Sequence, residues 1–302
     1  MNKSLKHLRQ APREISYAYT AQSRVGRAFI RSVENMTGRI GLIKRALGYE
    51  DEVSAGRDFW EVMTERYGVI LDAGPGGLDA IPTEGPLVMV SNHPFGILDG
   101  MAMGRMLSAR RKDFKIIANN VFHKAEELKE IILPISFGED REAQKQNLDT
   151  RREALRYLAE GGAIGIFPGG TVSTSRRPFG HPMDPAWRTF TAKLVAKSDA
   201  TILPVFFHGA NSRLFQLASR VHPTLRVALL INEFGRGIKT PLKATIGSPL
   251  SREEISKFSA HSHLLMDYLR DQTYLLSPDP LGSLDYGYEF EEHHAGRERR
   301  AA

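Results

Sequence analysis

Between residues 87 and 207 the chain alternates short apolar runs with longer amphipathic stretches. Apolar runs this short are typical of buried strands, and the stretches between them have the three- and four-residue spacing of helices. Such an alternation predicts an α/β fold, a mostly parallel sheet flanked by helices. The predicted strands are residues 87–91, 115–118, 132–136, 163–167 and 201–207, and the predicted helices are residues 98–110, 121–130, 141–160 and 187–198.

Outside this region the pattern is mainly helical. It predicts a helix over residues 51–67 that ends at Gly68, then helices at 212–220, 224–234 and 259–276 and a strand at 242–246. Glycine, charged residues and histidine dominate the end of the chain, which favours disorder. The predicted organisation is an N-terminal helical region at 1–67, an α/β domain at 68–276 and a disordered C-terminal tail at 277–302.

Residues 24–47 form a basic amphipathic segment. Its apolar residues recur every three or four positions and fall within a stripe of ~80°, with basic residues on the opposite side. Gly38 and Gly41 weaken the middle, so the segment is one helix or two. The stripe can lie in a membrane interface or pack on the domain core. The apolar residues are Val25, Phe29, Val33, Met36, Ile40, Ile43 and Leu47, and the basic ones are Arg24, Arg27, Arg31, Lys44 and Arg45.

The net charge of +6 comes from the beginning of the chain. Residues 1–50 contain ten Lys or Arg and three Glu, whereas the other 252 residues contain 31 basic and 32 acidic ones. This asymmetry predicts an anionic partner. An anionic lipid surface fits better than nucleic acid, because among the basic residues at 24–45 only one aromatic residue, Phe29, could stack on a base.

Cysteine is absent, so the chain has no disulfide, thiolate metal site or acyl-thioester intermediate on the protein. We expect no metal site either, since His261 and His263 point to different faces of a helix. No apolar run approaches the ~18 residues of a membrane span. The N-terminus also lacks the apolar core of a signal peptide. These features predict a peripheral protein on the cytoplasmic side of the inner membrane.

Candidate chemistry follows the first predicted strand of the alternating region. His93 and Asp99 lie in one short segment, and no serine, threonine or cysteine stands between them. A histidine can take a proton from a hydroxyl near neutral pH, and a carboxylate can orient it. The pair indicates base catalysis on a substrate hydroxyl. The alternative is a helix-capping aspartate beside a surface histidine.

Two further segments also occupy strand ends. Phe-Pro-Gly-Gly-Thr-Val-Ser at 167–173 follows the run at 163–166, and Ile-Leu-Pro-Val-Phe-Phe-His-Gly at 202–209 contains a further strand. In open α/β sheets, ligands bind beyond the carboxyl ends of the strands. We therefore expect these loops and the 92–99 loop to converge on one site.

These three segments, in this order, resemble the glycerolipid (lysophospholipid) acyltransferase family, and the later stretches 225–230 and 268–276 resemble its hemolysin-like branch. The resemblance implies O-acyl transfer from acyl-CoA or acyl-carrier protein to a lysolipid hydroxyl, with no metal or redox cofactor. His93 would be the general base and Asp99 its orienting carboxylate. Glycine-rich loop N–H groups would bind the oxyanion or the acceptor head. The implied substrate-binding residues are Asn92, Gly96, Pro168, Gly169, Gly170, Thr171 and Ser173, with Arg141, Arg176 and Arg177 as candidates for anionic groups.

The chain departs from the family pattern at three points. Five residues instead of four separate His93 from Asp99, and Gly96 can absorb the extra one because glycine tolerates unusual φ/ψ. Gly169 and Val172 stand where the family has the Glu and Arg that help to hold the acceptor's phosphate. This leaves open an acceptor like 1-acylglycerol-3-phosphate, a non-phosphate acceptor such as lyso-ornithine lipid, and a non-catalytic lipid-binding protein. A hydrolase is also open, although the serine elbow of such enzymes is absent.

Overall fold

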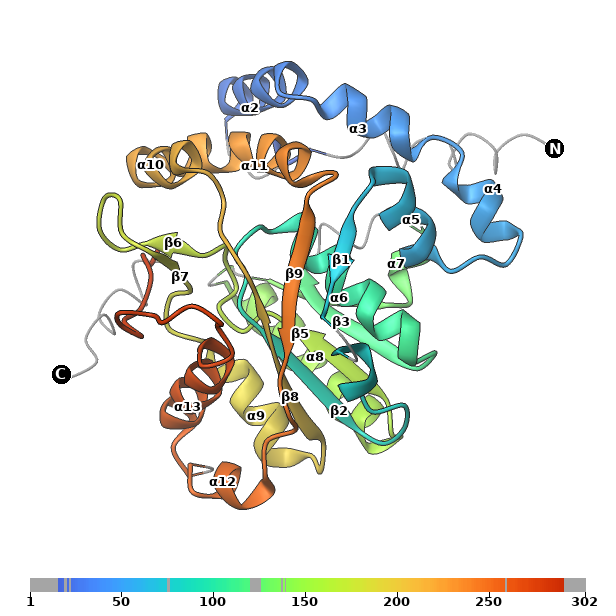
Figure 1. Cartoon of the computed structure of the whole chain (residues 1–302), viewed down its shortest axis with the longest axis vertical. Helices are drawn as coiled ribbons and strands as arrows, with labels where there is room; N and C mark the ends of the chain where they lie inside the picture. The colour runs from blue at the N-terminus through green and yellow to red at the C-terminus, as the bar shows by residue number, and fades with distance from the viewer. Residues whose placement is uncertain are drawn as a thin grey trace.

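The computed structural model describes residues 16–18, 21, 23–74, 77–119, 126–136, 138, 140–258 and 260–290. Its centre is a seven-stranded sheet in the order β1-β9-β8-β2-β5-β3-β4 (Figure 1). The sheet is parallel from β8 to β4, β9 is antiparallel to β8, and β1 is parallel to β9. The predicted mostly parallel α/β sheet is confirmed. The strands are β1 (Ile70–Asp72), β2 (Leu87–Ser91), β3 (Phe114–Asn119), β4 (Ile132–Ile135), β5 (Ala163–Ile166), β8 (Thr201–Phe207) and β9 (Pro241–Ile246), with a separate pair β6 (Thr174–Ser175) and β7 (Pro182–Met183).

The helices follow the predicted pattern with two differences. The helix predicted at 51–67 is two helices, α4 and α5, because the chain turns at 55–58, and α5 ends at Gly68 in the left-handed region. The short helix α12 was not predicted. The helices are α2 (Arg24–Met36), α3 (Arg39–Ala46), α4 (Tyr49–Ser54), α5 (Phe59–Tyr67), the 3₁₀ helix η3 (Gly77–Ala80), α6 (Ile97–Arg110), α7 (Glu126–Lys129), α8 (Arg141–Ala159), α9 (Thr189–Lys197), α10 (Arg213–Val221), α11 (Pro223–Gly237), α12 (Arg252–Ser256) and α13 (Ser262–Tyr274). Residues 121–125, the first part of the helix predicted at 121–130, lie outside the described residues.

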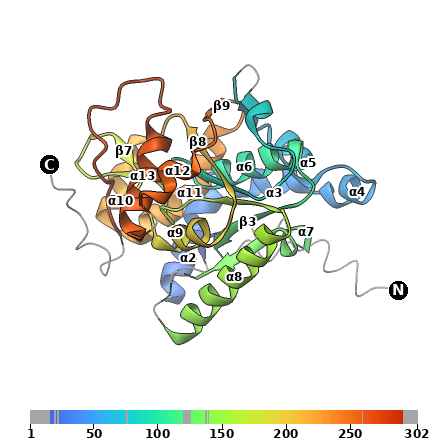
Figure 2. The ribbon, with the colours of Figure 1, turned by 90° about the horizontal axis from the view of Figure 1, so that it is seen from below.

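Helices cover both faces of the sheet. Every residue of β2 is buried as a result. Leu87 and Met89 face a core that also contains residues of α3, α5, α6 and α11. Val88 and Val90 face a second core built with α8, α9 and α13. Figure 2 shows α8 and α9 on the opposite side of the sheet from α5 and α6. A strand buried on both faces cannot alternate polar and apolar residues, which explains the continuous apolar runs.

The basic amphipathic segment is two helices, α2 and α3, joined at Gly38, whose φ is 116°. Only one side of α2 packs on the protein, through Ile30 and Glu34, and Ile30 clusters with Ala228 of α11. Most of the apolar stripe faces the solvent instead. Its exposed members are Val25 (81%), Phe29 (43%), Met36 (86%), Ile40 (52%) and Leu47 (50%), while Val33 and Ile43 are half-buried.

Residues 277–290 differ from the predicted disorder, because they pack beside the β6–β7 pair. Gly287 N donates to Asp184 O at 2.8 Å, and Tyr288 N donates to Thr174 O at 2.9 Å. Glu289 forms a bidentate ion pair with Arg188, at 2.9 and 3.0 Å. The rest of the predicted tail, residues 291–302, lies outside the described residues. The described part of the tail therefore belongs to the packed structure.

Candidate active site

Three neighbouring parallel strands end at one edge of the sheet. β2 lies between β5 and β8, so the loops after residues 91, 166 and 207 meet there. Asn92 joins two of these ends. Its side-chain amide donates to Phe207 O at 2.9 Å, and its side-chain oxygen accepts from Phe207 N at 2.7 Å. Asn92 is buried, and both the nitrogen and the oxygen of its side-chain amide are hydrogen-bonded to Phe207. It therefore holds the His93 loop against β8.

The structure brings His93 and Asp99 together. His93 Nδ1 lies 3.0 Å from Asp99 Oδ2, and the side chain of His93 is 18% exposed while that of Asp99 is fully buried. The same carboxylate oxygen accepts from the backbone N–H groups of Phe95 and Gly96 at 2.8 and 2.9 Å. Asp99 therefore holds the loop in shape and lies within ion-pair distance of one nitrogen of the imidazole, where a carboxylate can stabilise an imidazolium.

Burial raises the pKa of the Asp99 carboxyl, and the neighbouring His93 and the two backbone donors partly oppose this effect. The His93 ring also lies against the ring of Phe167, with centroids 4.3 Å apart and the two planes tilted by 31°. Phe167 is the first residue of the second sequence segment. The imidazole thus lies close to a carboxylate from the first turn of α6 and to an aromatic ring from the neighbouring strand end.

A second buried carboxylate connects the two loops. Asp184 Oδ1 accepts from Ser173 Oγ at 2.5 Å and from His93 N at 3.2 Å, and Asp184 Oδ2 accepts from Trp187 Nε1 at 2.9 Å. Ser173 N donates to His93 O at 2.8 Å. Ser173 is therefore a positioning residue for His93. Asp184 was missed in the sequence, where it stands alone after β7 with no pattern around it.

The glycines of the predicted site are explained by close approaches. A Cβ on Gly169 would come within 3.2 Å of the Asp184 carboxylate. A Cβ on Gly96, whose φ is 87°, would come within 3.2 Å of Val172. Gly170 has a φ of 70° and donates its N–H to Phe167 O at 3.0 Å, closing the turn after β5. Pro168 is buried at this turn, and its carbonyl accepts from Arg188 N.

The three arginines predicted to bind anionic groups all lie on the surface. Arg141 begins α8 after β4, three strands away from β2 in the sheet. Arg176 and Arg177 lie in the exposed β6–β7 turn. Among the described residues the buried cation beside the loop is instead Arg226 of α11, which donates to Thr171 and Val172. It lies within the stretch 225–230 that resembles the hemolysin-like branch, but that resemblance assigned no site role to Arg226.

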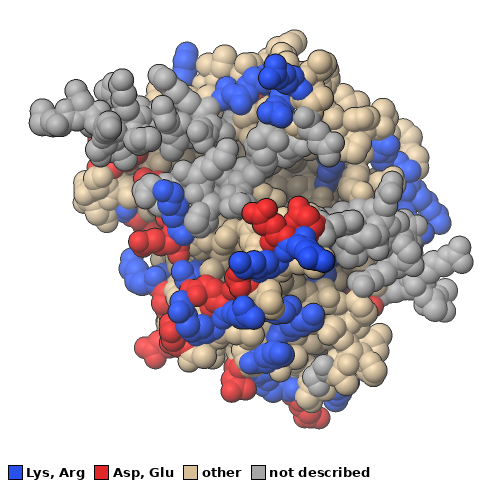
Figure 3. All heavy atoms as spheres, turned by 180° about the vertical axis from the view of Figure 1, so that it is seen from behind, with Lys and Arg blue, Asp and Glu red and all other residues tan. Residues whose placement is uncertain are grey.

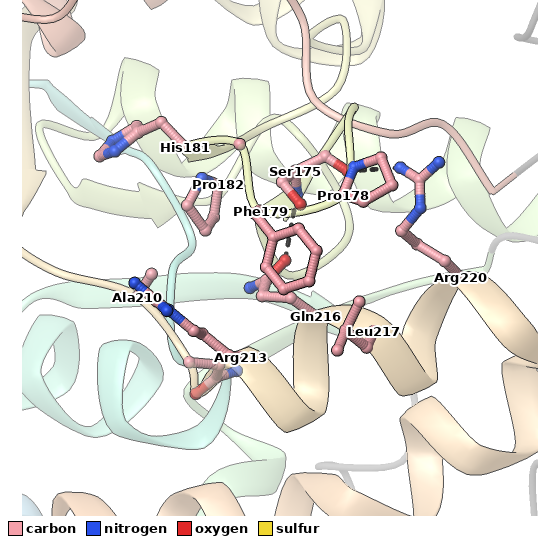
Figure 4. A pocket seen from close by; sticks show the side chains of 12 residues that line it. Ser175, Pro178, Phe179, His181, Pro182, Ala210, Arg213, Gln216, Leu217 and Arg220 are labelled. Atoms are coloured by element: carbon pink, nitrogen blue, oxygen red, sulfur yellow. Dashed lines mark hydrogen bonds between the residues drawn. The ribbon is translucent and has the colours of Figure 1, made fainter.

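A pocket of about 350 Å³ opens between α10 and the β6–β7 turn. Phe179 of the turn points toward Gln216 and Leu217 of α10 (Figure 4). Gln216 accepts from Ser175 N, which ties this pocket to the loop that contacts His93. His93 and Asp99 do not line it.

Across the described ranges, no group of three or more His, Cys, Asp or Glu residues could hold a metal ion. No helix in this part of the chain is both long and apolar enough to cross a membrane. The absence of a cofactor remains an expectation from the sequence.

Residues 40–279 match the model of a family described as acyltransferase, so the chain belongs to the acyltransferase family and is an acyltransferase. A lyso-glycine lipid O-acyltransferase from Bacteroides thetaiotaomicron is 27% identical over 237 residues, which cover 75% of this chain and 82% of the relative. A protein of the same name from Phocaeicola vulgatus is 26% identical over 189 residues, 60% of this chain and 65% of the relative. Among solved structures, the 1-acyl-sn-glycerophosphate (LPA) acyltransferase PlsC from Thermotoga maritima is 14% identical. The superposition covers 92% of this chain and 96% of the PlsC chain, with a TM-score of 0.43.

Proposed function

We propose that this acyltransferase moves a fatty acyl group from acyl-CoA or acyl-carrier protein to the hydroxyl of a lysolipid, and that the acceptor is an amino-acid lipid of the lyso-glycine type. The observation that carries the proposal is the His93–Asp99 pair, 3.0 Å apart at the convergent strand ends. The names of the two curated relatives support the acceptor class. Gly169 and Val172, in place of the residues expected for a phosphate, agree with it.

In the proposed reaction His93 Nε2 takes the proton from the acceptor hydroxyl while that oxygen attacks the thioester carbonyl. Asp99, on the Nδ1 side, fixes the tautomer and stabilises the imidazolium. The C–O bond of the new ester forms, the C–S bond breaks, and His93 returns the proton to the departing thiolate. No serine, threonine or cysteine ester on the protein is required.

We place this reaction at the cytoplasmic surface of the inner membrane. The exposed stripe of α2 and α3 gives an apolar face, and α10, which packs on α11 as α2 does, exposes Leu214, Leu217 and Val221. Basic side chains gather at the upper edge of the face in Figure 3, at the level of α2 and α3. An apolar face beside basic residues suits an anionic bilayer, where a lysolipid resides.

The test is a panel of lysolipids incubated with labelled acyl-CoA or acyl-carrier protein and analysed by mass spectrometry. We expect acylated lyso-glycine lipid from wild type, and a fall of ~10²–10⁴-fold for His93→Ala, the usual contribution of a general base. Ser256→Ala, on the exposed end of α12, is the matched control. Activity of His93→Ala within about threefold of wild type would refute the role of His93. Turnover of lysophosphatidic acid alone would refute the acceptor.

A further inference from the structure

Arg226 binds the loop that contacts His93. From α11 its guanidinium donates to Thr171 Oγ1 at 2.9 Å, Val172 O at 2.6 Å and Thr174 Oγ1 at 2.6 Å. A fourth bond, at 3.2 Å, goes to Ser219 Oγ. Three of these four oxygens belong to the segment that follows β5. The side chain of Arg226 therefore binds mainly this loop and, within the described structure, makes no hydrogen bond to its own helix.

No carboxylate among the described residues forms an ion pair with Arg226. Aromatic rings cover it instead, with its guanidinium carbon 5.1 Å from the ring centroid of Phe215 and 4.2 Å from that of Phe290. Arg226 is 6% exposed, and burial lowers its pKa from the ordinary value of arginine. A buried charge without an opposite charge is costly, and cation–π contacts offset only part of that cost. An anionic ligand would supply the missing charge.

One peptide unit connects this cation to the proposed base. The carbonyl of Val172 accepts from Arg226 Nη2, and the N–H of the same peptide unit, on Ser173, donates to His93 O at 2.8 Å. Hydrogen bonds in such a chain polarise one another. Arg226 thus lies one peptide unit and two hydrogen bonds from the His93 backbone, so it holds the same loop that positions the proposed base.

Thr171 is the member of this group that reaches the surface. It is half-buried, and its Oγ1 accepts from Arg226. A hydroxyl that accepts one bond still has a proton to donate. In the described structure that proton has no recorded acceptor. The hydroxyl, polarised by the guanidinium behind it, can therefore donate to an anion that arrives from the solvent side.

We propose that Thr171 and Arg226 form the subsite that recognises the carboxylate of the acceptor's head group. An N-acylated glycine keeps one free carboxylate, which matches one hydroxyl donor and one buried positive charge. This inference rests on the proposed function, because it assigns the head-group subsite of that same reaction. It also replaces the surface residues Arg141, Arg176 and Arg177 as the source of positive charge.

The experiment compares two acceptors, lyso-glycine lipid and its methyl ester, which differ by the charge of the head group and by one methyl group. For wild type we expect kcat/KM to be about tenfold or more higher for the acid, since charge-assisted hydrogen bonds are the stronger ones. Arg226→Met and Thr171→Val should bring the two acceptors within about threefold of each other, with Arg226→Lys and Thr171→Ser keeping most of the preference.

Arg270→Met is the matched control. Arg270 is also a buried arginine bonded to carbonyls and stacked on aromatic rings, but it binds Leu284, Asp285 and the backbone of Asp184. Its loss should lower turnover of both acceptors by the same factor and leave the preference intact.

Each outcome has one meaning. Equal turnover of acid and ester by wild type overturns the subsite while leaving the proposed function standing, whereas no turnover of either overturns the proposed function. A preference that survives in folded Arg226→Met and in Thr171→Val also overturns the subsite. If Arg226→Met does not fold, the wild-type ratio and the Thr171→Val ratio still decide.

Discussion

Asp99 has two roles, one structural and one chemical. Its Oδ2 accepts from two backbone N–H groups at the start of α6 and faces His93, while Oδ1 has no recorded hydrogen-bond partner within the described chain. Because burial raises its pKa, the ionised form lowers the stability of the fold at neutral pH. The ionised carboxylate of Asp99 that the proposed catalysis needs is therefore the form that burial disfavours.

We expect Asp99→Asn to lose activity without losing stability. The amide can still accept from the two backbone donors but cannot stabilise an imidazolium, so turnover should fall by ~10²-fold or more. The sign follows from the raised pKa: the wild type loses stability as pH rises from the ordinary aspartate pKa through the raised one. The melting temperature of Asp99→Asn should thus equal or exceed that of wild type at pH 7. The difference should shrink toward about pH 4, the pKa of an aspartate in the unfolded chain.

Asp99→Ala provides the contrast, since it removes the cap as well as the charge. Loss of a cap costs about 1 kcal/mol, or ~2–4 °C in melting temperature for a chain of this size. Calorimetry of both variants checks these values. A drop for Asp99→Asn as large as that for Asp99→Ala would contradict the idea that the charge itself is destabilising.

Gly169 is a second residue whose identity depends on a neighbour. Gly169→Glu would restore the residue expected from the family pattern, yet it would push a carboxylate against Asp184. We expect poor stability and loss of acyl transfer, because like charges buried together are costly. Gly169→Glu combined with Asp184→Gly should recover part of the stability in a denaturant titration. Additive losses in the double variant would show that the two positions do not interact.

At the scale of elements, the central sheet was predictable except for its edge strand β1, and the separate β6–β7 pair was not predicted. Strands buried on both faces leave continuous apolar runs, so β2 and β8 have the bounds that the sequence predicts. β1 has three residues at the edge of the sheet with an exposed-intermediate-exposed pattern, and β6 and β7 have two residues each. Segments this short contain too few residues for a periodicity.

The same difference applies to the site. His93 and Asp99 lie six residues apart, in the loop after β2 and in the first turn of α6, so the sequence shows them together. Asp184 and Arg226 reach the loop after β5 only because β7 and α11 fold back on it. Asp184 has no pattern around it, and the resemblance of the stretch 225–230 to the hemolysin-like branch does not show that Arg226 contacts this loop.

The helices α2 and α3 provide the element-scale prediction. Phe29→Ser with Met36→Ser should abolish flotation with anionic vesicles, because both side chains are exposed on the apolar stripe. Arg24→Glu, Arg27→Glu and Arg31→Glu together should weaken vesicle binding roughly a hundredfold at low salt, at about 1 kcal/mol for each basic residue. Wild-type binding should weaken as salt rises.

Leu264→Ser with Leu275→Ser is the matched control, since both leucines are exposed but belong to α13 or its end. This control should float like wild type. Turnover of a dispersed short-chain acceptor should be unchanged in the stripe variants, because the stripe lies outside the site. Failure of the wild type to float at low salt would disprove the membrane role of α2 and α3.

At the scale of the whole molecule, residues 284–290 pack against the segment that follows β5 and against β7. Gly287 packs so tightly that a Cβ there would come within 1.8 Å of Met183 O. Gly287→Ala should therefore detach this segment, expose the Arg188–Glu289 pair and remove Phe290 from Arg226. We expect faster proteolysis after residue 276 and a lower melting temperature.

Gly282→Ala is the control for this prediction, because a Cβ at Gly282 meets nothing within 4 Å. Its proteolysis and melting should match wild type. Equal protection of the 284–290 segment in Gly287→Ala and wild type would show that the neighbouring backbone adjusts to the methyl group.

The bonds from Gly287 to Asp184 and from Tyr288 to Thr174 also bear on how the protein is made. The site combines residues from positions 92 to 290, so its assembly requires contacts between segments far apart in the chain. Such contacts form slowly, and synthesis proceeds at ≈ 5–20 residues per second. A growing chain therefore exposes the apolar face of α2 for roughly 10–50 s before its catalytic loops can assemble. We expect the nascent protein to reach the membrane first and to become active there.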